Sequence, residues 1–99
     1  MKLIKKLINI FNKTEGSQES LAVGYSFAVT TGTYVGEIFI YVKQVEDNYC
    51  FLSIPKMLNR EVPVGKFEYA KKHKVIEFIE KIPRNESDMC ELQYKQNEE

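Results

Sequence analysis

The sequence predicts an α+β domain: an N-terminal amphipathic helix, a three- to four-stranded antiparallel meander, and C-terminal helices. Residues 21–31, LAVGYSFAVTT, alternate large or branched side chains with small ones, which is the period-two pattern of a strand. Residues 2–12 and 66–82 instead place apolar side chains three or four positions apart, as amphipathic helices do. A chain of 99 residues, 43% hydrophobic and 28% charged, is enough for one domain with a single modest core.

The first 20 residues divide into a predicted helix and a linker. In residues 1–13, MKLIKKLINIFNK, lysines and asparagines lie opposite one apolar face made of Leu3, Ile4, Leu7, Ile8 and Phe11. Residues 14–20, TEGSQES, are polar and contain a glycine, which is typical of a linker. A helix this short is not stable alone in water, so we expect it to pack on its own domain, bind a partner or contact a membrane surface weakly.

Residues 21–54 form the predicted meander, with strands at 21–31, 34–45 and 49–54. Gly32-Thr33 fits a two-residue type II′ turn, which favours glycine at its first central position, and Glu46–Asn48 fits a three-residue loop. The first turn would set Phe27 opposite Ile38, and the second would set Val42 opposite Leu52.

These registers predict a sheet that is apolar on both faces. One face would hold the large residues of all three strands, namely Val23, Tyr25, Phe27, Val29, Ile38, Ile40, Val42, Leu52 and Ile54. The other would combine the small residues of the first strand with aromatic residues and valines of the other two, namely Ala22, Gly24, Ser26, Ala28, Val35, Phe39, Tyr41, Val45, Tyr49 and Phe51, with Glu37 and Lys43 at its margins. A soluble monomer rarely exposes so large an apolar patch, so we expect the second face to be covered by the chain's own helices or by a partner.

The last part of the chain predicts two helices. Residues 55–65 are a connection that can include a short edge strand at residues 60–62. Residues 66–82 fit one helix with an apolar stripe, or a helix followed by a strand at residues 74–81. The charged Glu80 would interrupt the strand's apolar face, which favours the single helix. Pro83 ends it, and residues 85–97 form the second helix. The fold-level alternative is a small SH3-like or OB-like barrel, in which glycines ease the bending of five short strands.

The chemistry-bearing residues give little indication of catalysis. Fourteen basic residues balance fourteen acidic ones, so no overall field attracts nucleic acid or anionic membrane. Cys50 and Cys90 have no CxxC spacing, which predicts reduced thiols in a cytoplasmic protein, and no segment is predicted to span a membrane. The single histidine, His73, lies among lysines rather than near metal-ligand or nucleophile motifs. We therefore expect a protein without enzymatic activity, metal or cofactor.

The leading hypothesis is a small intracellular protein that acts by binding another protein or by self-association into a homodimer. An accessory or inhibitor-type protein of a bacterium, plasmid or phage fits the length and composition. The predicted contact residues lie on the aromatic sheet face and its margin: Phe39, Tyr41, Lys43, Tyr49 and Phe51.

The alternative hypothesis is a nucleic-acid-binding module. The basic segment would contribute Lys66, Lys71, Lys72 and Lys74, and the aromatic sheet face would act as a stacking platform for bases. Glutamates are interleaved with these cations, however, so a solvated helix face of mixed charge is the simpler interpretation.

Overall fold

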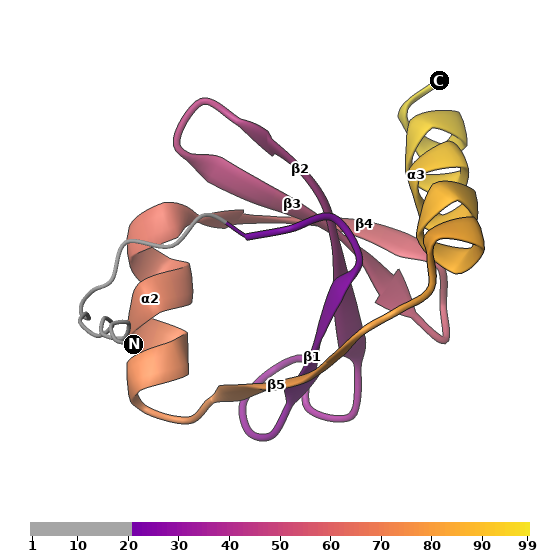
Figure 1. Ribbon diagram of the computed structural model, residues 1–99. Helices are drawn as coiled ribbons and strands as arrows, with labels where there is room; N and C mark the ends of the chain where they lie inside the picture. Colours follow the sequence, from indigo (N-terminus) through magenta and orange to yellow (C-terminus); the bar gives the residue numbers. More distant parts are fainter. Residues whose placement is uncertain (1–20) are drawn as a thin grey trace, which may run out of the picture.

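The computed structural model describes residues 21–99, so the predicted helix of residues 1–13 and the linker of residues 14–20 lie outside the described part. One antiparallel sheet contains the strands β1 (Tyr25–Val29), β2 (Ile38–Val45), β3 (Asn48–Ile54), β4 (Leu58–Pro63) and β5 (Ile76–Lys81). The two helices of this part are α2 (Val64–Lys72) and α3 (Arg84–Glu98) (Figure 1). The α+β class, the β1–β3 meander and the last helix are confirmed, and the connection contains the short edge strand as β4.

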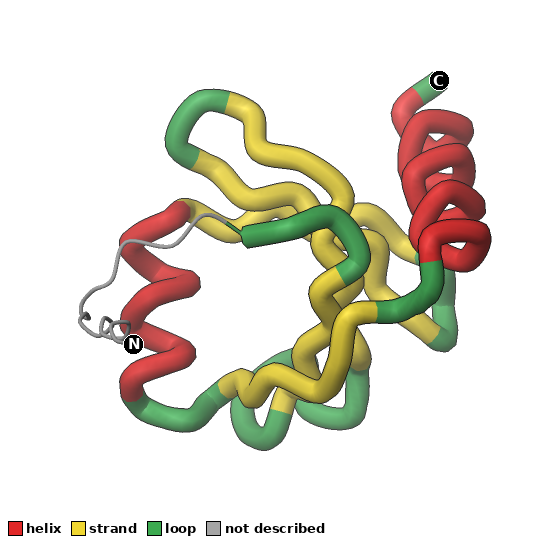
Figure 2. Tube along the Cα trace, in the orientation of Figure 1, coloured by secondary structure: helices red, strands yellow, loops and turns green. Residues whose placement is uncertain are grey.

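The sheet bends around an enclosed core, as the traces in Figure 1 and Figure 2 show. Its strand order is β4-β3-β2-β1-β5, so β4 and β5 are the two edges and each pairs on one side only. The sheet is therefore open, in contrast to the small closed barrel that the sequence offers as an alternative. Helix α2 joins the end of β4 to the start of β5 and lies beside the opening between these edges.

The predicted register between the first two strands is wrong by one residue. Phe27 pairs with Phe39, and Ala28 pairs with Ile38. The tight turn at Gly32-Thr33 is replaced by a wider loop, residues 30–37, in which the amide of Val35 donates to the carbonyl of Gly32 and that of Glu37 to Tyr34. Since side chains alternate along a strand, a shift of one residue exchanges the faces of β1 relative to β2. The large residues of β1 therefore share a face with the aromatic residues of β2 and β3, and the predicted trough of small residues does not form.

The predicted pairing of the second and third strands keeps its faces. Ile38 lies opposite Ile54 and Ile40 opposite Leu52, on one face as expected, although the pairing differs from the predicted one by two residues. The loop is the two-residue Glu46-Asp47, and an irregularity between Tyr41 and Lys43 adjusts the register. A shift of two residues leaves every side chain on its own face.

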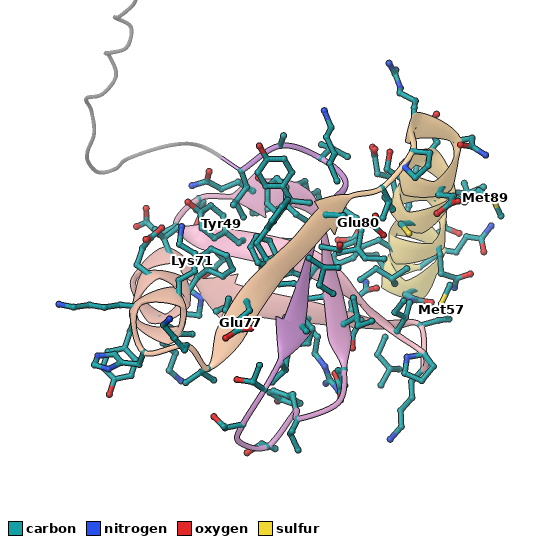
Figure 3. The ribbon with its side chains drawn as sticks, turned by 60° about the horizontal axis from the view of Figure 1, so that its bottom comes forward. Tyr49, Met57, Lys71, Glu77, Glu80 and Met89 are labelled. Atoms are coloured by element: carbon teal, nitrogen blue, oxygen red, sulfur yellow. The ribbon has the colours of Figure 1, made fainter. Side chains whose placement is uncertain are left out.

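The prediction of one helix over residues 66–82 is also wrong. Helix α2 ends at Lys72, and β5 runs antiparallel to β1. A β-bulge explains how a strand tolerates Glu80: Phe78 pairs with Phe27, but Glu80 pairs with Ser26, which leaves Ile79 as an extra residue. The bulge turns Glu80 to the face that carries Ser26, while Ile76 and Phe78 stay on the core face. Glu77 and Glu80 project from β5 in Figure 3.

Helix α2 and helix α3 cover different faces of the sheet. On the concave face, Phe67 of α2 enters a buried cluster with Phe27, Val29, Phe39, Tyr41, Tyr49, Phe51 and Ile76. On the convex face, Tyr94 of α3 packs against Val42, Cys50 and Leu52. The chain thus covers both apolar faces itself.

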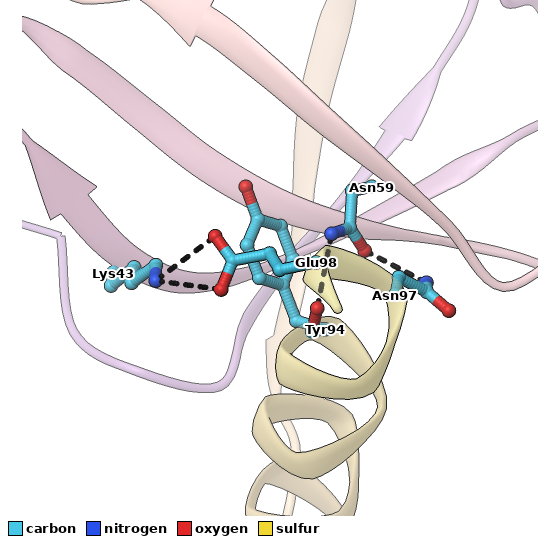
Figure 4. A network of polar contacts seen from close by, with 5 residues as sticks. All are labelled: Lys43, Asn59, Tyr94, Asn97 and Glu98. Carbon is cyan, nitrogen blue, oxygen red and sulfur yellow. Dashed lines mark hydrogen bonds and ion pairs between the residues drawn. The ribbon is translucent and has the colours of Figure 1, made fainter.

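Polar contacts hold the end of α3 on the convex face (Figure 4). The side-chain amide of Asn59 donates to the carbonyl oxygen of Tyr94 at 3.1 Å, and that of Asn97 donates to the side-chain oxygen of Asn59 at 2.8 Å. The ammonium of Lys43 lies 3.3 Å from the Glu98 carboxylate and 5.2 Å from the centroid of the Tyr94 ring. These contacts fix the last turns of α3 over β2 and β4.

Candidate functional site

The predicted contact residues of the aromatic face lie in the core. Phe39, Tyr41, Tyr49 and Phe51 are all buried, and Phe51 is 0% exposed. Burial raises the pKa of the Tyr41 and Tyr49 hydroxyls above their usual range, as expected for groups removed from water. Because these four rings contact one another and Phe67, they are not available on the surface of the folded chain. Of the two covers that the sequence offers for this face, the structure shows the chain's own helix α2.

Lys43 is separated from those four aromatic residues. Its side chain lies on the convex side, where it pairs with Glu98. The structure thus divides the predicted contact set between the core and the attachment of α3.

The alternative basic set lies together on α2 and just after it. Lys66, Lys71 and Lys72 belong to the helix and Lys74 follows it, and all four are exposed. Lys71, labelled in Figure 3, pairs with Glu68 at 3.8 Å. The rings of Tyr69 and His73 lie 4.1 Å apart, and Tyr69 is 64% exposed. This side of α2 carries one exposed aromatic pair among lysines, but not the predicted stacking platform of the sheet.

A cavity opens beside the edge of the sheet, and we call it the seam groove. It has a volume of about 550 Å³ and lies between β4, α2, loop 30–37 and the start of β5. Its floor includes the core residues Phe39, Phe67 and Ile76, and its rim includes Tyr34 and Tyr69. Apolar lining with a few polar groups is the usual character of a binding cavity.

An ion pair organises one wall of the seam groove. The guanidinium of Arg60 on β4 contacts both oxygens of Glu37, at 3.1 Å and 3.3 Å. The hydroxyl of Ser53 also donates to Glu37, and the ring of Tyr34 lies 4.3 Å from the guanidinium carbon of Arg60. Residues from loop 30–37, β3 and β4 are thereby tied together, and Tyr34 is held at the rim by a cation–π contact.

The same contacts set the charge state of Glu37. Burial raises the pKa of its carboxyl group, but the hydrogen bonds from Ser53 and Arg60 and the positive charge of Arg60 more than offset this, so the net pKa is lowered. Glu37 is therefore a carboxylate at neutral pH, and Arg60 is already paired. Lys66 also lines the groove, and within residues 21–99 no ion pair is found for it.

Two observations bear on metal and thiol chemistry in the described residues. No group of three or more His, Cys, Asp or Glu side chains in residues 21–99 is placed to hold a metal ion. Burial, together with the charges of Glu86 and Glu91, raises the pKa of the Cys90 thiol, so less of it is present as the reactive thiolate.

Sequence reasoning did not identify Tyr34, Arg60 or Tyr69 as residues of one site. Each lies in a different segment, and their proximity depends on how β4, α2 and loop 30–37 surround the open edge. One local signal was available, because Lys66 and Tyr69 lie off the apolar stripe of α2 that includes Phe67 and Ala70. Such residues face away from the core and can line a surface cavity.

Comparison of the chain with protein-family models, with curated proteins and with solved structures finds no match. Within residues 21–99, neither helix has the length and apolar character needed to cross a bilayer.

Proposed function

We propose that this protein is a non-catalytic binding protein that takes an extended segment of a partner protein into the seam groove. The observation that carries this proposal is the position of the groove along an unpaired sheet edge. Residues 59–63, most of β4, line it, and β4 has a strand partner only on the side of β3. An unpaired edge presents backbone N–H and C=O groups that can pair with another chain.

Strand addition gives the proposed complex both affinity and selectivity. In this binding mode the backbone of the peptide pairs with the edge strand, and its alternate side chains enter pockets. The apolar floor of the groove, with Phe39 and Phe67, would take one set of side chains. Tyr34 and Tyr69 on the rim would contact the same segment, and tyrosine supplies large contact area at low entropic cost.

In the described part of the chain the groove has one lining cation and one lining carboxylate without an ion-pair partner, Lys66 and Glu61, so an acidic residue of the segment would lie at Lys66 and away from Glu61. Arg60 is neutralised by Glu37, whereas Lys66 has no ion-pair partner in the described part of the chain. A carboxylate on the partner would meet the Lys66 ammonium without breaking an existing pair. Since a rim charge mainly affects the association rate, the apolar contacts would provide most of the affinity.

Selection from a random peptide library, followed by mapping on the protein by NMR, tests this proposal. Peptides that bind the full chain should shift the amide resonances of β4 and loop 30–37. The Tyr34→Ala/Tyr69→Ala variant should bind these peptides about tenfold more weakly, or weaker still, because loss of aromatic contacts at an interface lowers affinity by this much. Met89→Ala is the matched control, because Met89 is 70% exposed on α3, away from the groove.

A second measurement tests strand addition itself. N-methylation of successive peptide bonds in a selected peptide should weaken binding at every second position, because alternate N–H groups face the edge strand. Uniform tolerance of N-methylation would rule out strand addition. Peptides that shift α3 resonances instead of β4 would rule out the seam groove.

One observation favours a second candidate, the binding of single-stranded nucleic acid beside α2. The exposed Tyr69–His73 pair is flanked by Lys66, Lys72 and Lys74, and aromatic rings among cations can stack with bases. Phosphate contacts would make the affinity for an oligonucleotide fall steeply with salt, and Lys72→Ala/Lys74→Ala would reduce that slope. An affinity that is insensitive to salt would exclude this candidate.

A further inference from the structure

Helix α3 carries apolar side chains on the side that faces away from the sheet. Met89 and Leu92 are 70% and 57% exposed, and Met89 projects outward from the helix in Figure 3. The buried residues of this helix are Ser87 and Tyr94. Met89 follows Ser87 by two residues and Leu92 precedes Tyr94 by two, and residues two apart point to nearly opposite sides of a helix. The described part of the chain therefore leaves this outward pair largely uncovered.

The outward pair belongs to a longer stripe along the helix, which we call the α3 stripe. Its members are exposed, uncharged and spaced four, three and four residues apart: Asn85, Met89, Leu92 and Gln96. This spacing is that of the a and d positions at which two helices of a coiled coil meet. The α3 stripe therefore has the pattern of a helix–helix contact, with its apolar residues at the centre and amide side chains at both ends.

We propose that the α3 stripe is the contact surface of a homodimer, in which α3 of a second copy packs antiparallel to it about a two-fold axis. Met89 then lies against Leu92 of the second copy, and Asn85 lies against its Gln96, each contact occurring twice. The amide side chains of Asn85 and Gln96 can hydrogen-bond to each other at the ends of the apolar contact.

This surface differs from the one that the sequence predicts for self-association. That prediction used the aromatic sheet face, which α2 covers in the folded chain. The α3 stripe instead lies on the outer side of the helix that covers the convex face, away from the seam groove. The homodimer therefore does not depend on the proposed function.

Charge complementarity supports both this occupant and its orientation. Asp88 and Lys95 lie on one flank of the α3 stripe, and Glu86 lies on the other. In an antiparallel two-fold pair each flank meets the same flank of the second copy, so Asp88 lies beside Lys95 of the second copy at two places. In a parallel pair opposite flanks meet, and Asp88 would lie beside Glu86 of the second copy. Like charges there disfavour the parallel arrangement.

The charges of this flank are free to make the new contact. Within residues 21–99 no ion pair is found for Lys95. Asp88 lies 3.7 Å from Arg84, but their side chains are 59% and 92% exposed, and such an exposed pair contributes little to stability. Asp88 can therefore contact Lys95 of a second copy without the loss of a strong interaction.

Analytical ultracentrifugation of the full chain tests the homodimer. A helix of fifteen residues gives a small interface, so we expect a reversible dimer that forms between about 10 µM and about 1 mM. Met89→Gln/Leu92→Gln should weaken the dimer about tenfold or more and leave the circular dichroism unchanged, because both side chains are exposed. Val35→Gln/Val45→Gln is the matched control, since these valines are 59% and 43% exposed outside α3. A chain that stays monomeric throughout this range, or a dimer that resists the α3 substitutions, would overturn the proposal.

Exchange of the flanking charges tests the orientation. Asp88→Lys and Lys95→Asp should each weaken the dimer several-fold, because each sets like charges side by side at both contacts. The double variant should restore the dimer, and a mixture of the two single variants should associate as a heterodimer. Glu77→Lys on β5 controls for the change in net charge and should have little effect. A dimer that Asp88→Lys strengthens would be parallel, and one that the double variant fails to restore would not use this flank; either result contradicts the proposed packing.

Discussion

The two helices of the described part attach to the sheet in different ways. Helix α2 has nine residues, and its Phe67 is 1% exposed, with ring centroids 5.1 Å from Phe27, 5.2 Å from Tyr49 and 5.5 Å from Phe51. Helix α3 has fifteen residues, yet it buries only Ser87 and Tyr94, and polar contacts supply much of its attachment. The shorter helix is thus part of the core, and the longer one is an attached cover. Length alone is therefore a poor guide to how strongly a helix contributes to a fold.

Removal of the Phe67 ring should produce the largest effect. Phe67→Ala would leave a cavity among three aromatic rings, and truncation of a buried aromatic residue costs about 3–5 kcal/mol. For a domain of this size we expect the whole fold to be close to unfolding. Chemical denaturation measures the effect, and Tyr69→Ala on the exposed side of α2 is the control, with an expected change within about 0.5 kcal/mol. A small loss for Phe67→Ala would show that α2 is not a part of the core.

The sequence predicted the parts of the fold that depend on local pattern. The third strand, the last helix and the shared face of Ile40 and Leu52 follow from periodicity and from the chain breaks at Pro55 and Pro83. The short edge strand predicted at residues 60–62 is part of β4. The residues that define the third strand and the last helix are neighbours in the sequence, and Ile40 and Leu52 lie on two strands joined by one short loop.

The errors came from features that depend on contacts between distant residues. The width of loop 30–37 sets the face of Phe27, and two adjacent turns close that loop instead of the predicted single one. Likewise, the charge of Glu80 is inconsistent with a strand only if core-facing and solvent-facing side chains alternate without interruption from Ile76 onward. The bulge at Ile79 forms because β5 pairs with β1, where Phe27 lies opposite Phe78, and no local propensity encodes a pairing between such distant segments.

The candidate site was harder to predict than the fold. Lys66 belonged to the predicted basic set, but the seam groove also needs Tyr34 and Arg60 from separate segments. The aromatic pattern of β2 and β3 predicted an apolar face, and the register shift of one residue adds Phe27 and Val29 of β1 to that face, where Phe67 of α2 covers it. A prediction of surface function from a sheet is therefore only as good as its register.

Truncation of Tyr94 should have the next largest effect on stability, and it should show that α3 contributes to the fold differently from α2. Tyr94→Ala removes the main apolar contact of α3, and we expect a loss of about 2–4 kcal/mol, less than for Phe67 because the helix can settle toward the sheet. Hydrogen exchange should show loss of protection in α3 while β1–β3 remain protected. Equal loss of protection in the sheet would mean that α3 and the core unfold as one unit.

Neutralisation of Glu37 should have an intermediate effect that depends on pH. Because the folded-state pKa of Glu37 is lowered, its contribution is present above the unfolded-state pKa and disappears as the pH falls through the folded-state value. Glu37→Gln should therefore lower the free energy of unfolding by about 1–3 kcal/mol near neutral pH. Between about pH 6 and about pH 3 the free energy of unfolding should decline less in this variant than in the wild type. Urea denaturation across this range measures both, with Glu68→Gln as a control on the exposed side of α2. An unchanged pH profile in Glu37→Gln would mean that the Arg60 pair does not favour the folded state.

The smallest effect should come from the ion pair at the end of α3. Lys43 and Glu98 are 44% and 43% exposed in their side chains, and such pairs are screened by water and salt. A double-mutant cycle of Lys43→Met and Glu98→Gln should give a coupling below about 1 kcal/mol that decreases further with added salt. The same cycle with Asn59→Ala and Asn97→Ala tests the neighbouring hydrogen bond, which should be insensitive to salt. A coupling free energy between Lys43 and Glu98 as large as the loss of unfolding free energy in Tyr94→Ala would contradict this expectation. An exposed ion pair would then attach α3 to the sheet as strongly as the buried Tyr94 ring does.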